Sequence, residues 1–422
     1  MHLTPPLRRR STHSTRKGAA LYTVVVFNAL LVGLLGLSAL SIVRIERRQS
    51  TASIDQVIAR ENAASAVAVA LARIKNDSSW RSTFAHNTES TSINFSTGSG
   101  TWRLVDMVDT SLSNNVRHGV FIDGIGRCGA ATWIERVEAL QPELPLPTLA
   151  CAIHSHGRLR IDSGYALAAS GGVASTNGEL RVEGTIIGSA HCNMKTSGGA
   201  VTGTLTTGLA ARESPDSTTL FNTYRDLATS VSFNGGLNRH LLGPGVNTYG
   251  GSTNANGIYY INAGSSTLTI TSSRILGTLV VKGNVTINDY VFMQFQQREA
   301  PVLIVDGSVT LQCDSSRYLS EASETRNFNP ATAHFQGSGD EDTTDVYPSE
   351  IWGLVHVDGN LTINEPTRIV GMVLVDGEAR ISDNVTIQCD PTIFFAPPTG
   401  YWTAVPGPLT LKPTQWRRAA VQ

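Results

Sequence analysis

The stretches Gly353-Leu-Val-His-Val-Asp-Gly359 and Gly371-Met-Val-Leu-Val-Asp-Gly377 repeat one pattern. It consists of a glycine, five residues with alternating apolar side chains and a second glycine, and another short apolar strand follows it. Three other segments fit this frame, the last with proline in place of the first glycine: residues 178–184, 277–283 and 301–307. Internal repetition of this kind is typical of repeat folds.

The uneven spacing of the frames predicts an irregular solenoid. Between Gly283 and Gly377, successive second glycines lie 24, 52 and 18 residues apart. Glycine can turn a corner because φ > 0 is open to it, and the inward residues of each short strand stack on those of the next coil about 4.8 Å away. We therefore predict a mainly β fold, an irregular right-handed parallel β-helix over residues 149–396. Its turns are the second glycines: Gly184, Gly283, Gly307, Gly359 and Gly377.

An antiparallel β-sandwich is the alternative, because Asp-Gly also forms hairpin turns. The echo of Val309-Thr-Leu-Gln-Cys-Asp314 in Val385-Thr-Ile-Gln-Cys-Asp390 favours the solenoid, since hairpins give no reason for a whole coil to recur.

Two insertions interrupt the repeat. Residues 209–256 should contain a helix after Pro215. Residues 315–350 are acidic and lack the Gly and Glu placement of an EF-hand, so a solvated, mobile loop is expected there.

The N-terminal region predicts a membrane helix. Residues 1–17 carry five basic side chains and no acid, and the 26 residues of 18–43 carry no charge. As a helix, 26 residues span about 39 Å, enough to cross a hydrocarbon core of ~30 Å. The basic leader should stay in the cytoplasm and the rest of the chain should lie outside. The segment after the apolar stretch has no Ala-x-Ala-like signal cleavage site.

The helix should continue beyond the membrane. No Gly or Pro occurs in residues 37–97, so we expect one helix from about Ala19 to Lys75. Its outer half is rich in Ala and has apolar residues at helical spacing. This half should therefore pack one face against another part of the chain.

Arg16-Lys17-Gly18, followed at once by Ala19 and the apolar helix, resembles the class III leader of type IV prepilins and pseudopilins. A membrane peptidase cuts that leader after the glycine. The resemblance implies a prepilin peptidase as partner, a cut between Gly18 and Ala19, an inner-membrane location, and assembly with other pilins or pseudopilins.

The stretch from Ile45-Glu-Arg-Arg48 to the Ala-rich segment 63–66 is similar to the N-terminal region of PilX-type minor pilins. Together the two resemblances cover roughly residues 8–75. Most pilins have Glu five residues after the cut, where this chain has Thr23, and K-type minor pseudopilins also lack the Glu. The resemblance therefore implies a minor subunit, and a plain single-pass membrane anchor is the alternative.

Between the helix and the repeats, three expected strands at 100–105, 119–124 and 131–139 form a small antiparallel meander that would cover the helix. Closely spaced prolines then mark a stiff linker. The predicted division is leader 1–18, helix 19–76, meander 77–141, linker 142–148, β-helix 149–396 with insertions at 209–256 and 315–350, and Pro-rich C-terminal tail 397–422.

Charge and cysteine usage exclude several classes of function. The 33 Lys and Arg balance 34 Asp and Glu, and no basic stripe follows residue 50, so nucleic acid is excluded as a partner. The cysteines lie far apart without a CxxC pattern, which predicts no metal site, and no cofactor motif is present. One or two disulfides are compatible with a location outside the cytoplasm. The cysteines are Cys128, Cys151, Cys192, Cys313 and Cys389.

No catalytic set stands out. His154 and His156 flank Ser155, but no GxSxG elbow surrounds them and adjacent strand residues point to opposite faces, so we interpret them as surface or turn residues. Four asparagines at repeat positions are expected to form hydrogen-bonding ladders: Asn284, Asn288, Asn360 and Asn364.

Three aspartates fall at the same position of the repeat, beside the second glycine: Asp306, Asp358 and Asp376. We interpret them as turn acids. The alternative is a functional column on the outer face of the β-helix, of the kind that polysaccharide lyases and hydrolases place there.

We therefore expect a structural protein without enzymatic activity. It would be a membrane-anchored minor-pilin-like or pseudopilin-like subunit that displays a β-helix, in the periplasm or outside the cell, for assembly or surface binding. The alternative is a membrane-tethered β-helix that binds a surface glycan or degrades a polysaccharide.

Overall fold

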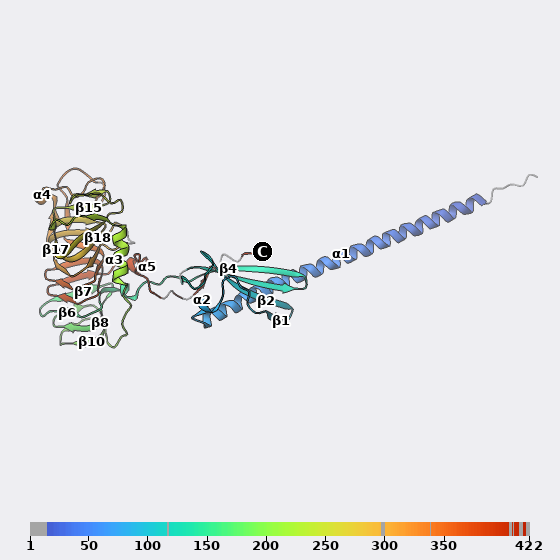
Figure 1. Ribbon diagram of the computed structural model, residues 1–422, viewed down its shortest axis with the longest axis horizontal. Coiled ribbons are helices and arrows are strands. Elements are labelled where there is room, and N and C mark those ends of the chain that lie inside the picture. Colours follow the sequence, from blue (N-terminus) through green and yellow to red (C-terminus); the bar gives the residue numbers. More distant parts are fainter. Residues whose placement is uncertain are drawn as a thin grey trace, which may run out of the picture. The chain divides into compact units, whose positions relative to one another are not determined.

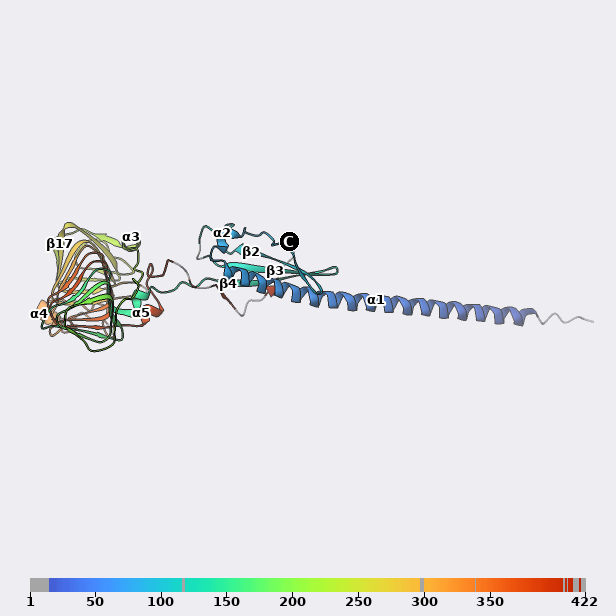
Figure 2. The same ribbon diagram turned by 90° about the horizontal axis from the view of Figure 1, so that it is seen from below.

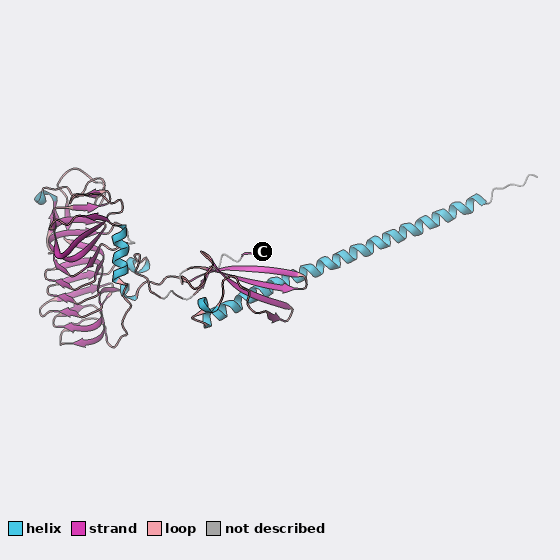
Figure 3. Cartoon of the chain, in the orientation of Figure 1, coloured by secondary structure: helices cyan, strands magenta, loops and turns pink. Residues whose placement is uncertain are grey.

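The structure is a computed structural model that describes residues 15–115, 118–296, 300–337, 339–404, 407, 409–412 and 417–418, without the side chains of 15–20 and 417–418. The chain divides into two compact units, the first formed by Met1–Pro142 with Pro406–Gln422 and the second by Glu143–Val405. Figures 1 and 3 show helix and antiparallel strands in the first unit and stacked short strands in the second. The second unit is thus an insertion in the first.

The first unit is built on one long helix, α1 (Thr15–Asn76). The expected continuous helix is confirmed and begins early enough to include the predicted cut site, whereas residues 1–14 of the predicted leader lie outside the described residues. Side chains 21–54 are exposed, and the described helix contains an apolar window long enough to cross a membrane by length and composition. Farther along, one stripe of the helix is buried: Ala59, Ala63, Ala66, Val67, Ala70 and Ile74.

The buried stripe of α1 packs on an antiparallel sheet, which confirms the expected meander. The sheet consists of β1 (Ile93–Phe95), β2 (Gly98–Asp106), β3 (Val120–Cys128) and β4 (Ala131–Leu140) in that order, and a short helix, α2 (Trp80–Thr83), precedes it. Two short strands after the solenoid, β28 (Thr410–Leu411) and β29 (Arg417–Arg418), also pair with β4. The segment predicted as a tail therefore returns to this sheet and hydrogen-bonds an edge strand that would otherwise be unpaired.

Glycines in β3 allow the sheet to approach α1 unusually closely. A Cβ atom added to Gly126 would lie 1.9 Å from the carbonyl oxygen of Ala59, and one added to Gly124 would lie 2.1 Å from that of Ala63. The helix backbone thus rests directly on the strand backbone. The alanines of the outer helix permit the same close approach from the helix side, because their side chains are small.

The second unit is a parallel β-helix-like solenoid, which excludes the antiparallel sandwich; its handedness stays a prediction. The first strands are β5 (Cys151–Ser155), β6 (Leu159–Ile161), β7 (Ala166–Ser170), β8 (Val173–Val182), β9 (Thr185–Ile187), β10 (Ala190–Thr196), β11 (Ala200–Val201) and β12 (Leu205–Thr206). After helix α3 (Ser217–Leu227) come β13 (Thr229–Val231), β14 (Gly236–Asn238), β15 (Leu241–Gly243) and β16 (Val246–Asn247). The remaining coils contain β17 (Ile258–Leu276), β18 (Thr278–Gln294), β19 (Leu303–Asp306), β20 (Val309–Gln312), β23 (Glu350–Val357), β24 (Leu361–Ile363), β25 (Thr367–Val375), β26 (Ala379–Ile381) and β27 (Val385–Gln388). Short helices η1 (Pro147–Ala150) and α5 (Thr392–Phe395) flank these coils in the sequence.

The coils are not stacked in chain order. The first coil, β5 to β7, pairs on one side with β8 and β9 and on the other side with the last coil, β25 to β27. The chain continues to β10 to β12, passes through α3, and resumes with β13 to β15 beside β17. It then returns coil by coil to the first one. Figure 2 shows the stack turned by 90° from the view of Figure 1.

Aliphatic columns fill the solenoid as the repeat predicts. Val305 pairs with Val357, and Val357 with Val375, and all three are at most 1% exposed. The turn glycines are required mainly by close contact between coils: an added Cβ at Gly359 would lie 2.7 Å from the backbone of Gly307, and one at Gly377 2.5 Å from the carbonyl oxygen of Gly359.

Both insertions are more ordered than expected. Residues 209–256 include β13 to β16 as well as the predicted helix. Residues 315–350 contain β21 (Tyr318–Ser320), α4 (Glu321–Glu324) and β22 (Val346–Pro348) and bury Phe328 and Tyr347. The acidic part of this insertion, 341–344, is exposed as expected, but the insertion is not solvated throughout, because it covers Arg274, which is 0% exposed and donates hydrogen bonds to the carbonyl groups of Phe328 and Ala333. A buried guanidinium needs such acceptors.

Gly126→Ala tests the contact between α1 and the sheet. The added methyl group overlaps the helix backbone, so we expect the first unit to lose about 1–3 kcal/mol of stability, the usual cost of overpacking. Hydrogen exchange of the full chain in detergent should show faster exchange in β2 to β4 and unchanged exchange in β17 and β18. Gly198→Ala is the matched control, because a Cβ there has no neighbour within 4 Å among the described residues. Equal exchange in both variants would contradict the close contact.

Candidate functional site

Helix α3 covers one outward face of the solenoid, and Figure 1 shows it lying along the stack of strands. The helix begins after Asp216, whose side chain accepts a hydrogen bond of 3.1 Å from the backbone N–H of Thr219. This cap satisfies one free donor of the first turn. Leu220, Phe221 and Tyr224 on the inner side of α3 are buried against the strands.

The strand residues beneath this helix form a column in register. Ile304 pairs with His356, His356 with Leu374, and Leu374 with His154. Each of them is at most 2% exposed although it points out of the solenoid core. An outward column is buried only where another element covers it, so the two histidines lie in a covered layer and not on a free surface.

A cavity of about 200 Å³ lies between α3 and the strands. Its wall combines apolar, basic and acidic groups. They include Ser217, Phe221 and Arg225 from α3, and Lys282, Asp306, His356 and Asp358 from the solenoid.

The three aspartates at the same repeat position lie in one column, and two of them reach this cavity. Asp306, Asp358 and Asp376 follow three valines that pair in successive coils. Lys282 pairs with Asp306 at one end of the column. The interpretation of these residues as simple turn acids is therefore incomplete, because two of them line the cavity.

The acids of the column differ in their affinity for protons. Partial burial raises the pKa of Asp358, and the charges of Asp376 and Asp306 raise it further. Burial also opposes ionisation of Asp376, but hydrogen bonds from His356 and Ser217 outweigh it, so the pKa of Asp376 lies below its ordinary value. A carboxylate thus lies beside a carboxyl group that keeps its proton to higher pH.

His356 connects α3 to the acid column. Its Nε2 lies 3.2 Å from Ser217 Oγ and 3.8 Å from Asp376 Oδ2, and its Nδ1 lies 3.1 Å from the hydroxyl of Tyr401. The Ser217 hydroxyl donates to Asp376. In a Ser-His-Asp triad the carboxylate bonds to Nδ1 and the imidazole receives the serine proton. Here tyrosine occupies the Nδ1 side and the serine proton points to the carboxylate, so the geometry is not that of acyl transfer.

The cavity is chemically suited to hold a polar ligand. Asp306 and Asp358 supply carboxyl oxygens to its wall, and Lys282 and Arg225 supply positive charge. A few convergent polar groups beside an apolar wall, here Phe221, are typical of small-ligand sites.

The histidines that the sequence placed on the surface separate in the structure. His156 is exposed, but His154 is 1% exposed, its Nδ1 lies 3.2 Å from Ser175 Oγ, and burial followed by the charges of Arg212 and His156 lowers its pKa to about 4. The surface interpretation was wrong for His154 because α3 and its preceding segment cover this face. Ser155 points into the solenoid and donates to the carbonyl oxygen of Gly377.

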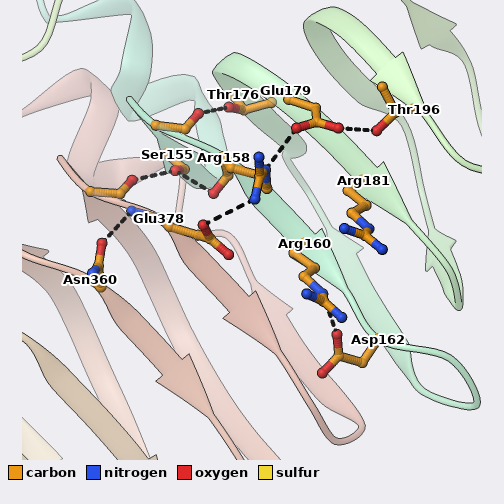
Figure 4. A network of polar contacts seen from close by, with 12 residues as sticks. Ser155, Arg158, Arg160, Asp162, Thr176, Glu179, Arg181, Thr196, Asn360 and Glu378 are labelled. Carbon is orange, nitrogen blue, oxygen red and sulfur yellow. Dashed lines mark hydrogen bonds and ion pairs between the residues drawn. The ribbon is translucent and has the colours of Figure 1, made fainter.

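A second outward face carries an ion-pair ladder (Figure 4). Arg158 lies between Glu179, at 2.8 Å, and Glu378, at 3.6 Å, and Arg160 contacts Asp162 at 2.6 Å. The charges alternate and neutralise each other, and exposed pairs of this kind contribute little stability.

Asparagines on this face link neighbouring coils. Asn360 Oδ1 accepts from the backbone of Glu378 at 2.8 Å (Figure 4), and Asn284 Oδ1 from that of Ser308 at 3.0 Å. Asn360 and Asn284 thus bind the next coil's backbone, and the face offers no concentrated charge to a partner.

The remaining predicted residues lie outside the cavity. Arg16, Lys17, Gly18 and Ala19 lie in the first turns of α1, with Thr23 following, and they belong to the first unit. The five cysteines are all free in the structure.

Sequence reasoning missed Ser217, His356 and Tyr401. A weak local signal was present at His356, since the equivalent position is apolar in three other frames, at Val280, Ile304 and Leu374, although the frame 178–184 has Arg181 there. Ser217 and Tyr401 arrive from distant segments, and no spacing rule connects them to the repeat.

Comparisons with known proteins give neither a family nor a close relative. No protein-family model matches the chain, and no curated protein matches its sequence. Among solved structures, an ice-binding protein (LeIBP) from an Arctic yeast has 12% identity and a TM-score of 0.31, covering 59% of this chain and 94% of its own. The ice-binding protein of the Antarctic ascomycete Antarctomyces psychrotrophicus has 14% identity and a TM-score of 0.29, covering 59% and 100%. The competence-associated pilin ComZ from Thermus thermophilus has 10% identity and a TM-score of 0.25, covering 86% and 98%. Because every TM-score is below 0.5, these likenesses by themselves assign no function.

Asparagine substitutions test the opposite pKa directions of the two acids. A carboxyl group whose pKa is raised by folding stabilises the fold below its ordinary pKa of 3.8, and that contribution is lost as pH rises through the folded value. Asp358→Asn should therefore raise the urea midpoint at pH 7, and the gain should vanish as pH falls towards 3.8. Because Asp358 is only partly buried and solvent screens its charge, less than about 1 kcal/mol is expected.

Asp376→Asn should act in the opposite direction. Its lowered pKa stabilises the fold above the ordinary value of 3.8, and this contribution is lost as pH falls through the folded value. The midpoint of Asp376→Asn should be lower than that of the wild type at pH 7. Shifts of the same sign for both variants at pH 7 would contradict this arrangement of the site.

Proposed function

We propose that this protein is a membrane-anchored, minor-pilin-like or pseudopilin-like subunit that displays a β-solenoid. The observation that carries the proposal is the division of α1. Its first part is apolar and exposed, and its second part packs through alanines on an antiparallel sheet. A membrane or other apolar helices would cover the first part, because exposing more than 20 residues of apolar helix to water is unfavourable.

The place of the solenoid in the chain supports display. It is inserted between β4 and β28, which are neighbours in the sheet that packs on α1. The anchor and the solenoid are therefore connected through the sheet by two chain segments. In this proposal the inner membrane and other pilins or pseudopilins are the partners of α1, the leader is cytoplasmic, and the solenoid lies in the periplasm or outside the cell.

The absence of Glu at Thr23 favours a minor subunit. An acid at this depth of an apolar helix is expensive unless it is paired, and a filament-building subunit resembling the pilins would use it to meet a neighbouring amine. Thr23 provides no charge for such a pair. The proposed subunit therefore joins an assembly of other subunits and does not build the filament alone.

We propose recognition, without turnover, for the cavity under α3. A glycan on a cell surface is the ligand class that fits, because alternating hydroxyl donors and acceptors match Asp358, Asp376 and Lys282. The alternative of polysaccharide cleavage is kept because adjacent carboxyl and carboxylate groups can act as acid and base.

Processing of the N-terminus tests the proposed subunit class. We expect mass spectrometry of protein isolated from membranes to show a chain that begins at Ala19, which places the cut after Gly18. Gly18→Glu should abolish the cut, because it puts a bulky charge at the edge of the membrane. Gly36→Ala, in the same helix, is the control and should be processed normally. A chain that retains Met1 in cells with an active prepilin peptidase would contradict the pilin-like role and leave only a membrane anchor.

Polyuronates and neutral glycans test the cavity. We expect binding of a glycan by the full chain in detergent, weakened at least tenfold by Asp358→Ala and unchanged by Asp342→Ala, an exposed acid in another loop. We expect no release of shortened product, with or without calcium. Release of shortened product that is abolished by Asp358→Ala would contradict recognition without turnover and support the alternative of polysaccharide cleavage.

A further inference from the structure

A second group of polar side chains lies in the first unit, at the loop between β2 and β3. Asp106 ends β2, Asp109 lies in the loop, and His118 lies two residues before β3. One ligand atom from each residue lies within 4.8 Å of the other two. His118 Nδ1 is 3.2 Å from Asp106 Oδ1 and 3.6 Å from Asp109 Oδ2.

Burial of Asp106 distinguishes this group from an ordinary acidic surface, although Asp109 is exposed and His118 is half-buried. The side chain of Asp106 is 0% exposed, yet its Oδ2 has no hydrogen-bond partner among the described residues. His118 Nδ1 is also buried and, within the same part of the chain, makes no hydrogen bond of acceptable geometry. An unpaired carboxylate oxygen and an unpaired imidazole nitrogen in one buried place are costly. A cation between them would satisfy both.

Neighbouring groups hold the three side chains in place. Asp106 Oδ1 accepts from the backbone N–H groups of Val108, at 2.8 Å, and Asp109, at 3.0 Å. The amide of Asn114 donates to Asp109 Oδ2 at 2.6 Å. Hydrogen bonds of this kind orient ligands before an ion binds.

Arg81 fixes the other side of the loop. Its guanidinium donates to the carbonyl oxygens of Leu112, at 3.1 Å, and His118, at 2.6 Å. These bonds direct it to the backbone and not to the carboxylates. Its positive charge interacts with Asp106, but none of its hydrogen bonds among the described residues goes to Asp106 or Asp109, so the carboxylate oxygens of both stay available to a cation.

We propose that Asp106, Asp109 and His118 bind a divalent transition-metal ion, with Zn²⁺ as the best-fitting representative. Zinc lies about 2.0–2.2 Å from nitrogen and oxygen ligands, so two ligands of a tetrahedral site are about 3.3–3.6 Å apart. The observed separations of 3.2 and 3.6 Å match this spacing. The imidazole disfavours Ca²⁺ and Mg²⁺, which take oxygen ligands.

Three protein ligands leave one position of the ion open for water or for a group of another molecule. The ion would tie the β2–β3 loop to both strands and so stabilise the first unit. This proposal does not rest on the membrane role or on the cavity under α3, because it uses none of their residues.

Metal titration of the full chain in detergent tests the site. After treatment with a chelator and its removal, the protein should bind one equivalent of Zn²⁺ by isothermal titration calorimetry, more tightly than Ca²⁺ or Mg²⁺. Hydrogen exchange in residues 106–115 should slow when Zn²⁺ is added. His118→Gln and Asp109→Asn should each weaken binding at least about 100-fold, since even loss of a ligand's hydrogen-bond partner weakens metal binding roughly 10- to 100-fold.

Matched substitutions in other loops serve as controls. His334→Gln and Asp342→Asn remove an exposed histidine and an exposed aspartate of the second unit and should leave Zn²⁺ affinity unchanged. Asp358→Asn should also leave it unchanged, which separates this site from the acid column. Absence of Zn²⁺ binding, or binding that persists in both His118→Gln and Asp109→Asn, would overturn the proposal. Equal affinity for Ca²⁺ and Zn²⁺ would overturn the assignment of the metal.

Discussion

Parallel pairing between the first coil and the last coil is the constraint on which the arrangement of the second unit depends. Because β5 to β7 lie beside β25 to β27, the incoming and outgoing segments of the solenoid meet at the same level of the stack. The backbone N–H of Leu146 bonds to Tyr401 at 3.1 Å, and that of Thr403 to Leu144 at 2.8 Å. A solenoid stacked in chain order would separate its ends by about 4.8 Å for every coil. The closed order lets the unit be inserted between adjacent strands of another sheet through short connections.

The same closure explains why α3 exists. After β12 the chain has reached one end of the stack and must continue at the other end, beside β17. A helix of 11 residues spans part of that distance, about 16 Å, and its apolar side buries a column that the solenoid would otherwise expose. The crossing also brings Ser217 to His356, two residues that 139 positions separate in the chain. The candidate cavity is thus a consequence of how the chain returns.

The sequence predicted the properties that a coil carries by itself. The glycine frames encode inward valines and tight turns, so the parallel solenoid, the valine column and the aspartate column were predictable. The order in which the coils stack was not predictable. Each frame forms a strand that pairs on both sides, but the frames are too similar to show which coil is the neighbour. The burial of His154 and the order in residues 315–350 were missed for a similar reason. Helix α3 covers His154 and Arg274 binds the insertion, and the repeat pattern predicts neither contact. The ligand set proposed for Zn²⁺ escaped the cysteine and histidine spacing rules, since pairing of β2 with β3 brings His118 back to Asp106.

Helix α1 shows how one element meets two environments with different side chains. Large apolar residues such as Leu30, Phe27 and Val32 project from its first part. These side chains provide apolar contact area that does not require a partner of complementary shape. In its second part alanines face Gly124 and Gly126, and backbones touch. Contact between backbones fixes distance and rotation, because no side chain can adjust to a shift. The rotation of the anchor about its own axis is therefore set by the sheet. A molecule that packs on the exposed part of α1 would therefore meet a face whose rotation relative to the sheet is fixed.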